Sequence, residues 1–258
     1  MSKAPPTGKL VLVPNTLDLG TTPEPLDTVL SREVMRRAAS LTCWVVENAK
    51  TARSFLKRVD AVEPLCMPLQ NLQITELPRA RKGDPKGQVA TAAWLELLAP
   101  AFKGLDIGLL SEAGLPAVAD PGAALVHAAH EAGIVVEPLA GASALTLGLA
   151  ASGLNGQRFA FEGYLPQQAD ARAQRVRELE QRSRREAQTQ IVIETPYRNT
   201  ALMSALVQLL NPQTRLSVAC GLTSTGGWCR TRSVAQWRAE GMLSLPADLP
   251  AVFMWLAD

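Results

Sequence analysis

The sequence predicts an α/β protein built from two α/β domains. Its 258 residues exceed the usual size of a single domain. Short β-rich runs alternate along the chain with segments of helical spacing, as they do in sheets flanked by helices. Aromatic residues make up 5% of the chain and hydrophobic residues 47%, so the core must consist mainly of Leu, Val and Ala. This composition argues against an all-β sandwich and against a disordered chain.

The first half of the chain alternates strands and helices. Residues 9–13 (KLVLV) and 42–47 (TCWVVE) are short β-rich runs, and Pro14 ends the first of them. Strands separated by helices in this way indicate a parallel or mixed sheet. The further predicted elements of this half are helices at 26–39, 51–59 and 87–98 and a strand at 106–111.

A stretch rich in Gly and Pro, residues 114–122, separates the two halves. We place the expected domain boundary there, which gives an N-terminal domain of residues 1–116 and a C-terminal domain of residues 117–258. The alternation restarts beyond the boundary. The predicted helices are 125–132, 142–151, 170–187 and 200–210, and the predicted strands are 134–137, 159–161, 190–194, 215–221, 228–233 and 251–257.

Charge and cysteine usage limit the partners and cofactors. A formal charge of +2 is too small for a global field that attracts nucleic acid, so contact with a polyanion has to come from local basic clusters. Four cysteines without a C-x-x-C pair and two histidines give no zinc motif, and we expect no metal. Residues 1–9 lack the apolar run of a secretory signal, and residues 139–151 are too few to span a bilayer. We therefore expect a cytoplasmic protein without a membrane partner.

The most informative segment is SEAGLPAVADPG, residues 111–122. It follows the predicted strand DIGLL, and open α/β sheets bind ligands at the carboxyl ends of their strands. Gly and Pro at this density fix a backbone that can turn its N–H groups toward a ligand. The segment is thus either a ligand-binding loop or an ordinary turn between domains.

Four motifs resemble one family. SEAGLPAVADPG is similar to the S-D-A-G-x-P-x-x-S-D-P-G signature of the ribosomal RNA small-subunit methyltransferase I family, a branch of the tetrapyrrole methylase superfamily. Residues 138–166 resemble its P-G-x-x-A…S-G-L…R-F-x-F-x-G-F-L-P block, in the same order. IETPYR at 193–198 resembles Y-E-S-P-H-R, and VENAKTARSFLK at 46–57 resembles the segment that begins E-D-T-R. The resemblance covers nearly the whole chain.

The resemblance implies a tetrapyrrole methylase-like methyltransferase that binds S-adenosylmethionine in a cleft between its two domains. It also implies small-subunit ribosomal RNA as the substrate, methylated on a ribose, and a homodimer. The cofactor-binding residues that it implies are Ser111, Glu112, Ala113, Gly114, Pro116, Asp120, Pro121, Gly122, Ala142, Ser143, Tyr164, Leu165, Pro250 and Ala251.

Charged residues near the expected cleft are the candidates for catalysis and substrate binding. Methyl transfer from a sulfonium is an in-line displacement, so the protein mainly supplies orientation, desolvation and a proton acceptor. The predicted catalytic residues are Glu47, Lys50, Glu194 and Arg198, each of which could instead be a solvated ion-pair partner at a helix end. The predicted RNA-contacting residues are Arg53 and the basic loop of Arg79, Arg81, Lys82 and Lys86.

The chain departs from the family pattern where the substrate is expected. The changed positions are Asn15 in the first loop, Asn48 and Lys50 in the E-D-T-R segment, Glu112 in the signature, and Cys220 and Gly221 in a later A-R-E-L-T segment. Two alternatives therefore stand beside rRNA methylation. One is a methylase of a small molecule such as a tetrapyrrole, and the other is a non-catalytic relative that binds RNA or ribosomes.

Overall fold

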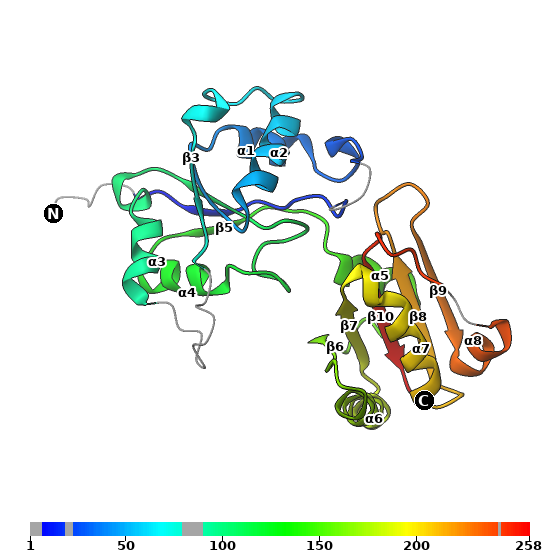
Figure 1. The fold of residues 1–258 in the computed structure, drawn as a ribbon. Coiled ribbons are helices and arrows are strands. Elements are labelled where there is room, and N and C mark those ends of the chain that lie inside the picture. Colours follow the sequence, from blue (N-terminus) through cyan, green and yellow to red (C-terminus); the bar gives the residue numbers. More distant parts are fainter. Residues whose placement is uncertain (1–6, 19–22, 79–89, 242–243) are drawn as a thin grey trace. The chain divides into compact units, whose positions relative to one another are not determined.

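The computed structural model describes residues 7–18, 23–78, 90–241 and 244–258. The chain divides into two compact units, one of residues 1–19 and 25–142 and the other of residues 20–24 and 143–258 (Figure 1). Each unit contains one five-stranded sheet with helices packed against it, which confirms the predicted α/β class.

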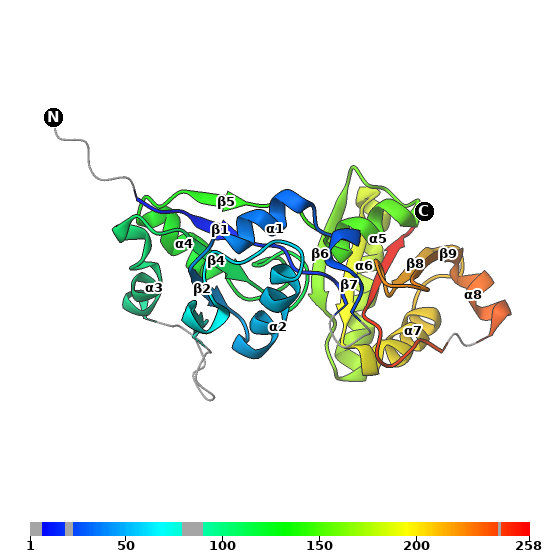
Figure 2. The same ribbon diagram turned by 90° about the horizontal axis from the view of Figure 1, so that it is seen from above.

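The sheet of the first unit is parallel. Its strands follow the order β3-β2-β4-β1-β5, and every neighbouring pair runs in the same direction. All its carboxyl ends therefore meet at one edge (Figure 2). The strands are β1 (Leu10–Leu12), β2 (Cys43–Val46), β3 (Gln73–Glu76), β4 (Ile107–Leu110) and β5 (Val136–Pro138).

Two pairs of helices cover the two faces of this sheet, α1 (Arg32–Ala39) with α2 (Ala49–Asp60) on one and α3 (Thr91–Leu98) with α4 (Ala123–Glu131) on the other (Figure 1). Strand β2 shows why, since Trp44 packs with α1 and α2 while Val45 packs with α3 and α4. Buried strands of this kind are apolar on both faces. Gly108 of β4 is required beneath Trp44, because a Cβ there would lie 2.6 Å from the indole ring.

After the neighbouring strands β1 and β4, the chain crosses to opposite faces of the sheet and returns to opposite sides of this pair. The connection after β1 runs through α1 to β2 on one face, and the connection after β4 runs through α4 to β5 on the other. Strands β1 and β4 lie side by side in the sheet. Ligands of open α/β sheets bind where neighbouring connections diverge in this way, at the carboxyl edge.

The second unit has a mixed sheet of order β6-β7-β10-β8-β9. Strands β6 and β7 are parallel, and the other neighbours are antiparallel. Its strands are β6 (Phe159–Tyr164), β7 (Thr189–Glu194), β8 (Arg215–Cys220), β9 (Trp228–Ser233) and β10 (Ala251–Leu256).

Helices cover the two faces of the second sheet unequally. The helices α6 (Ala169–Glu186), α7 (Asn199–Leu209) and α8 (Val234–Glu240) pack on one face. On the other face α5 (Ala144–Ser152) is the single helix in the described part of the chain. Its Gly148 permits close packing, since a Cβ there would lie 3.3 Å from Met254 of β10. Among the described residues, no helix is long and apolar enough to cross a bilayer.

Four features differ from the sequence predictions. The helix expected at 26–39 is a short 3-10 turn followed by α1, because the Ser31 side chain accepts a hydrogen bond from Val34 N and caps α1 there. Strand β3 and helix α8 had not been predicted. The boundary between the units lies after Ala142 and not at Pro116, because β5 pairs with β1 and so belongs to the first sheet.

Candidate functional site

The loop after β4 has a strained backbone. Between Ser111 and Gly122, four residues have positive φ: Gly114 (65°), Ala117 (67°), Ala119 (64°) and Gly122 (132°). Glycine adopts such angles freely, but alanine does so only at a cost in free energy. Strain of this kind gathers at ligand-binding sites. The loop thus has the position and the backbone expected of the predicted cofactor site.

The loop after β1 holds this strained segment. Asn15 is 6% exposed, and its Nδ2 donates to the carbonyl oxygens of Ser111 (3.1 Å) and Glu112 (3.0 Å). The backbone N of Asn15 donates to Gly114 O at 2.8 Å, and Gly114 N donates to Thr16 O at 3.2 Å. Asn15 therefore contacts the candidate loop, whereas the sequence predictions treated it only as a departure from the family pattern.

Glu47 holds the loop from the end of β2. Its Oε2 accepts a hydrogen bond from Glu112 N at 3.0 Å, so this predicted catalytic residue does lie beside the predicted cofactor loop. The next residue, Asn48, caps α2 by accepting from Lys50 N at 2.9 Å, a role in which Asn serves as well as Asp. Lys50 and Arg53 are exposed on α2.

Three carboxylates gather at this edge. Burial, followed by the negative charges of Glu47 and Glu112, raises the pKa of Asp120 to about 7. In the described part of the chain no ion pair neutralises any of the three. No group of three Asp, Glu, His or Cys side chains among the described residues has the geometry of a metal site. Electrostatically, this edge suits a ligand that carries positive charge.

The loop after β4 contains hydrogen-bond donors that have no partner among the described residues. Within residues 7–18, 23–78, 90–241 and 244–258, the N–H groups of Ala113 and Leu115 have no partner. The Ser111 side chain is 2% exposed, and its Oγ is likewise unpartnered. Buried polar groups are normally hydrogen-bonded, so the unpartnered Ser111 hydroxyl marks this loop as a candidate for binding a ligand.

The predicted residues of the second unit gather at one edge of its sheet. Across three strands, Ala251 pairs with Glu194 on one side and with Cys220 on the other. Arg198 Nη2 donates to Glu194 Oε1 at 2.6 Å, and this hydrogen bond raises the pKa of Arg198. The predicted Glu194 and Arg198 pair is therefore present as an ion pair.

The remaining predicted cofactor residues differ in exposure. Tyr164 ends β6 and is 56% exposed, whereas Leu165 is 3% exposed in the core, so only its backbone can meet a ligand. Pro250 O accepts from Gly221 N at 2.9 Å. Ser143 is the N-terminal residue before α5, and its side chain makes no capping hydrogen bond.

The basic loop that was predicted to contact RNA, with Arg79, Arg81, Lys82 and Lys86, lies outside the described residues.

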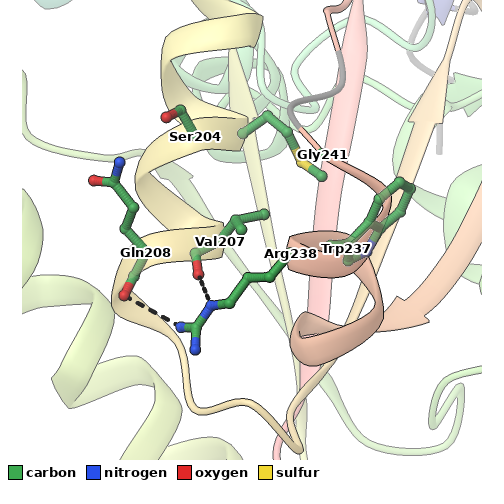
Figure 3. A pocket seen from close by; sticks show the side chains of 7 residues that line it. Ser204, Val207, Gln208, Trp237, Arg238 and Gly241 are labelled. Carbon is green, nitrogen blue, oxygen red and sulfur yellow. Dashed lines mark hydrogen bonds between the residues drawn. The ribbon is translucent and has the colours of Figure 1, made fainter.

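A pocket elsewhere in the second unit contains none of the predicted residues. It lies between α7 and α8 and has a volume of about 210 Å³ (Figure 3). Arg238 points across it and donates to Val207 O (2.9 Å) and Leu210 O (3.0 Å). These carbonyl groups end α7, so Arg238 serves as a helix cap there.

Comparison with known proteins places the chain among methylases. The model of the family Tetrapyrrole (Corrin/Porphyrin) Methylases matches residues 28–239. A Synechocystis protein named ribosomal RNA small subunit methyltransferase I is 40% identical over 155 residues, which are 60% of this chain and 53% of that protein. The chain spans about half the length of the curated relatives that it matches.

Two solved structures share the fold. The methyltransferase CobJ is 17% identical with a TM-score of 0.56, and the alignment covers 97% of this chain and 95% of that one. Uroporphyrin-III C-methyl transferase from Thermus thermophilus, complexed with S-adenyl homocysteine, is 16% identical with a TM-score of 0.51 and coverages of 96% and 97%. Because the family model matches most of the chain, this protein belongs to the tetrapyrrole (corrin/porphyrin) methylase family.

Proposed function

We propose that the protein is an S-adenosylmethionine-dependent methyltransferase that acts on small-subunit ribosomal RNA. The observation that carries the proposal is the strained loop Ser111–Gly122, which stands where the connections of β1 and β4 diverge. Family membership supplies the reaction class, and the loop supplies a site whose chemistry suits the cofactor.

The residues of the loop fit S-adenosylmethionine on two counts. The carboxylate of S-adenosylmethionine can accept hydrogen bonds from the N–H groups of Ala113 and Leu115, which have no partner among the described residues. The positive charges of S-adenosylmethionine suit the carboxyl edge of the first sheet, which carries the carboxylates of Glu47, Glu112 and Asp120. We therefore assign the methionine end of the cofactor to this loop, including Pro116, Pro121 and Gly122. By resemblance, Ala142 and Ser143 form a second cofactor-facing stretch, and Tyr164, Leu165, Pro250 and Ala251 take the adenosine side.

When bound, the cofactor supplies a methyl group activated by a sulfonium. The protein has to orient the acceptor, exclude water and take up a proton. Among the described residues, Glu47 and Glu194 each engage one carboxylate oxygen in hydrogen bonds. We propose that the second oxygen of one of these carboxylates accepts the proton. Lys50 and Arg198 are proposed to orient the acceptor beside them.

The substrate assignment is drawn from the relatives, whose name gives ribosomal RNA as their substrate. Arg53 and the loop of Arg79, Arg81, Lys82 and Lys86 are proposed to neutralise RNA phosphates. A small tetrapyrrole remains the second candidate, because CobJ and the uroporphyrin-III methyltransferase share the fold.

Labelled S-adenosylmethionine distinguishes these substrates. The protein is incubated with small ribosomal subunits from a strain that lacks the corresponding activity, and in parallel with a tetrapyrrole precursor. We expect label in the RNA, at a nucleotide that primer extension or mass spectrometry can map. Label only in the tetrapyrrole would move the assignment to a small-molecule methylase. Cofactor binding without transfer to either would favour the non-catalytic relative.

We also propose that the protein is a homodimer that uses the α5 face of the second sheet. Phe161 pairs with Ile191, which packs against α5, so Phe159 and Phe161 lie on that face. Their exposed fractions are 46% and 37%, and Leu147 of α5 is 39% exposed. A second copy that covered this face would bury these side chains.

Sedimentation velocity tests the dimer. Phe159→Glu combined with Phe161→Glu should convert the dimer into a monomer, because two charges would be buried in an apolar contact. The matched control is Val62→Glu on the first unit, where Val62 is 40% exposed. A parent protein that sediments as a monomer at all concentrations would contradict the proposal.

A further inference from the structure

We infer that Asn15 is a positioning residue for the cofactor: its amide directs the N–H groups of the loop after β4 toward the ligand. The inference rests on the proposed function of that loop. Asn15 does not have to touch the cofactor itself, because it acts through the peptide groups between Ser111 and Leu115.

Asn15 uses its whole side-chain amide in these contacts. Nδ2 donates one hydrogen to Ser111 O and one to Glu112 O, and Oδ1 accepts from Thr16 N at 2.9 Å. An amide is the side-chain group that offers two donors and an acceptor together. The residue is buried, so water cannot replace these bonds when the amide is removed.

The direction of the carbonyl groups fixes the direction of the N–H groups. In a trans peptide, the C=O of one residue and the N–H of the next point in opposite directions. The carbonyl groups of Ser111, Glu112 and Gly114 all point at Asn15. The N–H groups of the residues that follow them, Glu112, Ala113 and Leu115, must therefore point away from it.

These N–H groups are the ones that the site needs. The N–H of Glu112 meets the Glu47 carboxylate at 3.0 Å, and those of Ala113 and Leu115 have no partner within the described residues. Asn15 and Glu47 thus hold the Glu112 peptide from opposite sides. The two N–H groups without a partner therefore point to the side away from Asn15.

Neighbouring residues hold Asn15 in place. Thr16 Oγ1 donates to the carboxylate of Asp18, which is 8% exposed and paired with Arg58 of α2 at 2.8 Å. This network joins the loop after β1 to a helix of the same unit. A backbone hydrogen bond from Gly114 N to Thr16 O, at 3.2 Å, also joins the two loops beside Asn15.

The test compares Asn15→Ala, Asn15→Ser and Asn15→Asp. S-adenosylhomocysteine affinity is measured by calorimetry, and amide hydrogen exchange is followed for residues 111–118 without ligand. We expect Asn15→Ala to weaken the affinity at least about tenfold and to speed exchange, since one buried and one partly buried carbonyl group lose their donors. Asn15→Ser retains one donor and should fall between Asn15→Ala and the parent. Asn15→Asp should bind S-adenosylhomocysteine most weakly of the three variants, because its carboxylate oxygens would face two carbonyl oxygens.

The control is Arg37→Ala, which removes ion pairs at the opposite edge of the same sheet. It should lower the melting temperature and leave both the affinity and the exchange of residues 111–118 at the parent values. Asn15 variants that fold and bind S-adenosylhomocysteine as the parent does would overturn the inference while the proposed function stood. A parent that binds no S-adenosylhomocysteine would instead overturn the proposed function.

Discussion

The two edges of the first sheet treat charge in opposite ways. At the amino edge, Arg37 Nη2 meets Asp106 at 2.7 Å and Glu137 at 3.0 Å, and Lys9 adds a contact to Glu137 at 3.1 Å. At the carboxyl edge, the carboxylates of Glu47, Glu112 and Asp120 have no cation partner among the described residues. The ion pairs of the amino edge join α1 to the strands β4 and β5, whereas the carboxylates of the carboxyl edge lack such partners and are proposed to face a ligand.

The pKa values show the same difference. The hydrogen bond from Arg37 lowers the pKa of Glu137. Burial opposes ionisation of Asp106, but hydrogen bonds from Lys9 N and Arg37 outweigh it and lower the pKa of that carboxyl too. At the other edge, burial and like charges raise the pKa of Asp120 to about 7. Charge is therefore stabilising at one edge and destabilising at the other, as expected when one edge is structural and the other functional.

The largest expected effect comes from Gly114→Val at the functional edge. Gly114 has a φ of 65°, and a Cβ there would lie 3.3 Å from Leu17. A β-branched residue cannot hold this backbone, so S-adenosylmethionine affinity should fall by about a hundredfold or more. Calorimetry measures the loss.

Gly133→Val is the matched control. Gly133 also has a positive φ, of 71°, but nothing lies within 4 Å of its missing Cβ, and it follows the end of α4 that is opposite the loop. It should lose a comparable amount of stability, about 2 kcal/mol, and no affinity. Equal affinities in Gly114→Val and the parent would show that the loop does not bind the cofactor.

The second effect is on stability and comes from Arg37→Ala at the structural edge. Near neutral pH the variant should lose about 2 kcal/mol of unfolding free energy, because two partly buried carboxylates lose a charged donor. Since the folded-state pKa values of Asp106 and Glu137 are lowered, this stabilisation is present above their unfolded values and disappears as the pH falls through the folded ones. Urea unfolding at pH 7 and pH 3 checks this. A deficit that does not shrink at pH 3 would rule out the ion pairs as its cause.

The smallest effect concerns the strained alanines. Replacing Ala117 and Ala119 by glycine relieves two positive φ angles but adds freedom to the unfolded chain, so stability should rise by only about 0.5 to 1 kcal/mol. In regular structure the same change should destabilise, and Ala128→Gly in α4 should lose at least about 1 kcal/mol. Thermal unfolding of the parent and of both variants measures these changes in stability. A loss of stability in the first variant would mean that these alanines are not strained.

The fold was largely predictable because periodicity marks buried elements well. Strands such as β2 are apolar throughout, and the helices carry one apolar stripe. Strand β3 escaped prediction because it is an edge strand whose residues Gln73–Glu76 are mostly exposed. The domain boundary was misplaced because the Gly and Pro residues of 114–122 lie in a loop inside the first unit, and a loop of that composition resembles a linker.

Parts of the candidate site that depend on local sequence could be proposed in advance, and their role in binding stays a prediction. The loop Ser111–Gly122 and the Glu194 and Arg198 ion pair could be recognised from motifs. The role of Asn15 could not, because its partners lie 96 and 97 residues away and hydrogen bonds of that range leave no local pattern. The one local signal was the place of Asn15 in the loop that follows the short strand β1, at the carboxyl edge of an α/β sheet.

The central claim is that the acidic carboxyl edge of the first sheet binds the positive charge of S-adenosylmethionine, and a titration at two pH values tests it most directly. A cation beside Asp120 favours the ionised form of its carboxyl group. Because the pKa of Asp120 in the free protein is about 7, binding of the cation releases a proton near and below that pH. Between pH 6 and pH 7.5 the affinity of the parent should rise several-fold, by at most about tenfold, and that of Asp120→Asn should stay nearly constant. Equal pH dependence in the two proteins, or no binding by the parent, would contradict the claim.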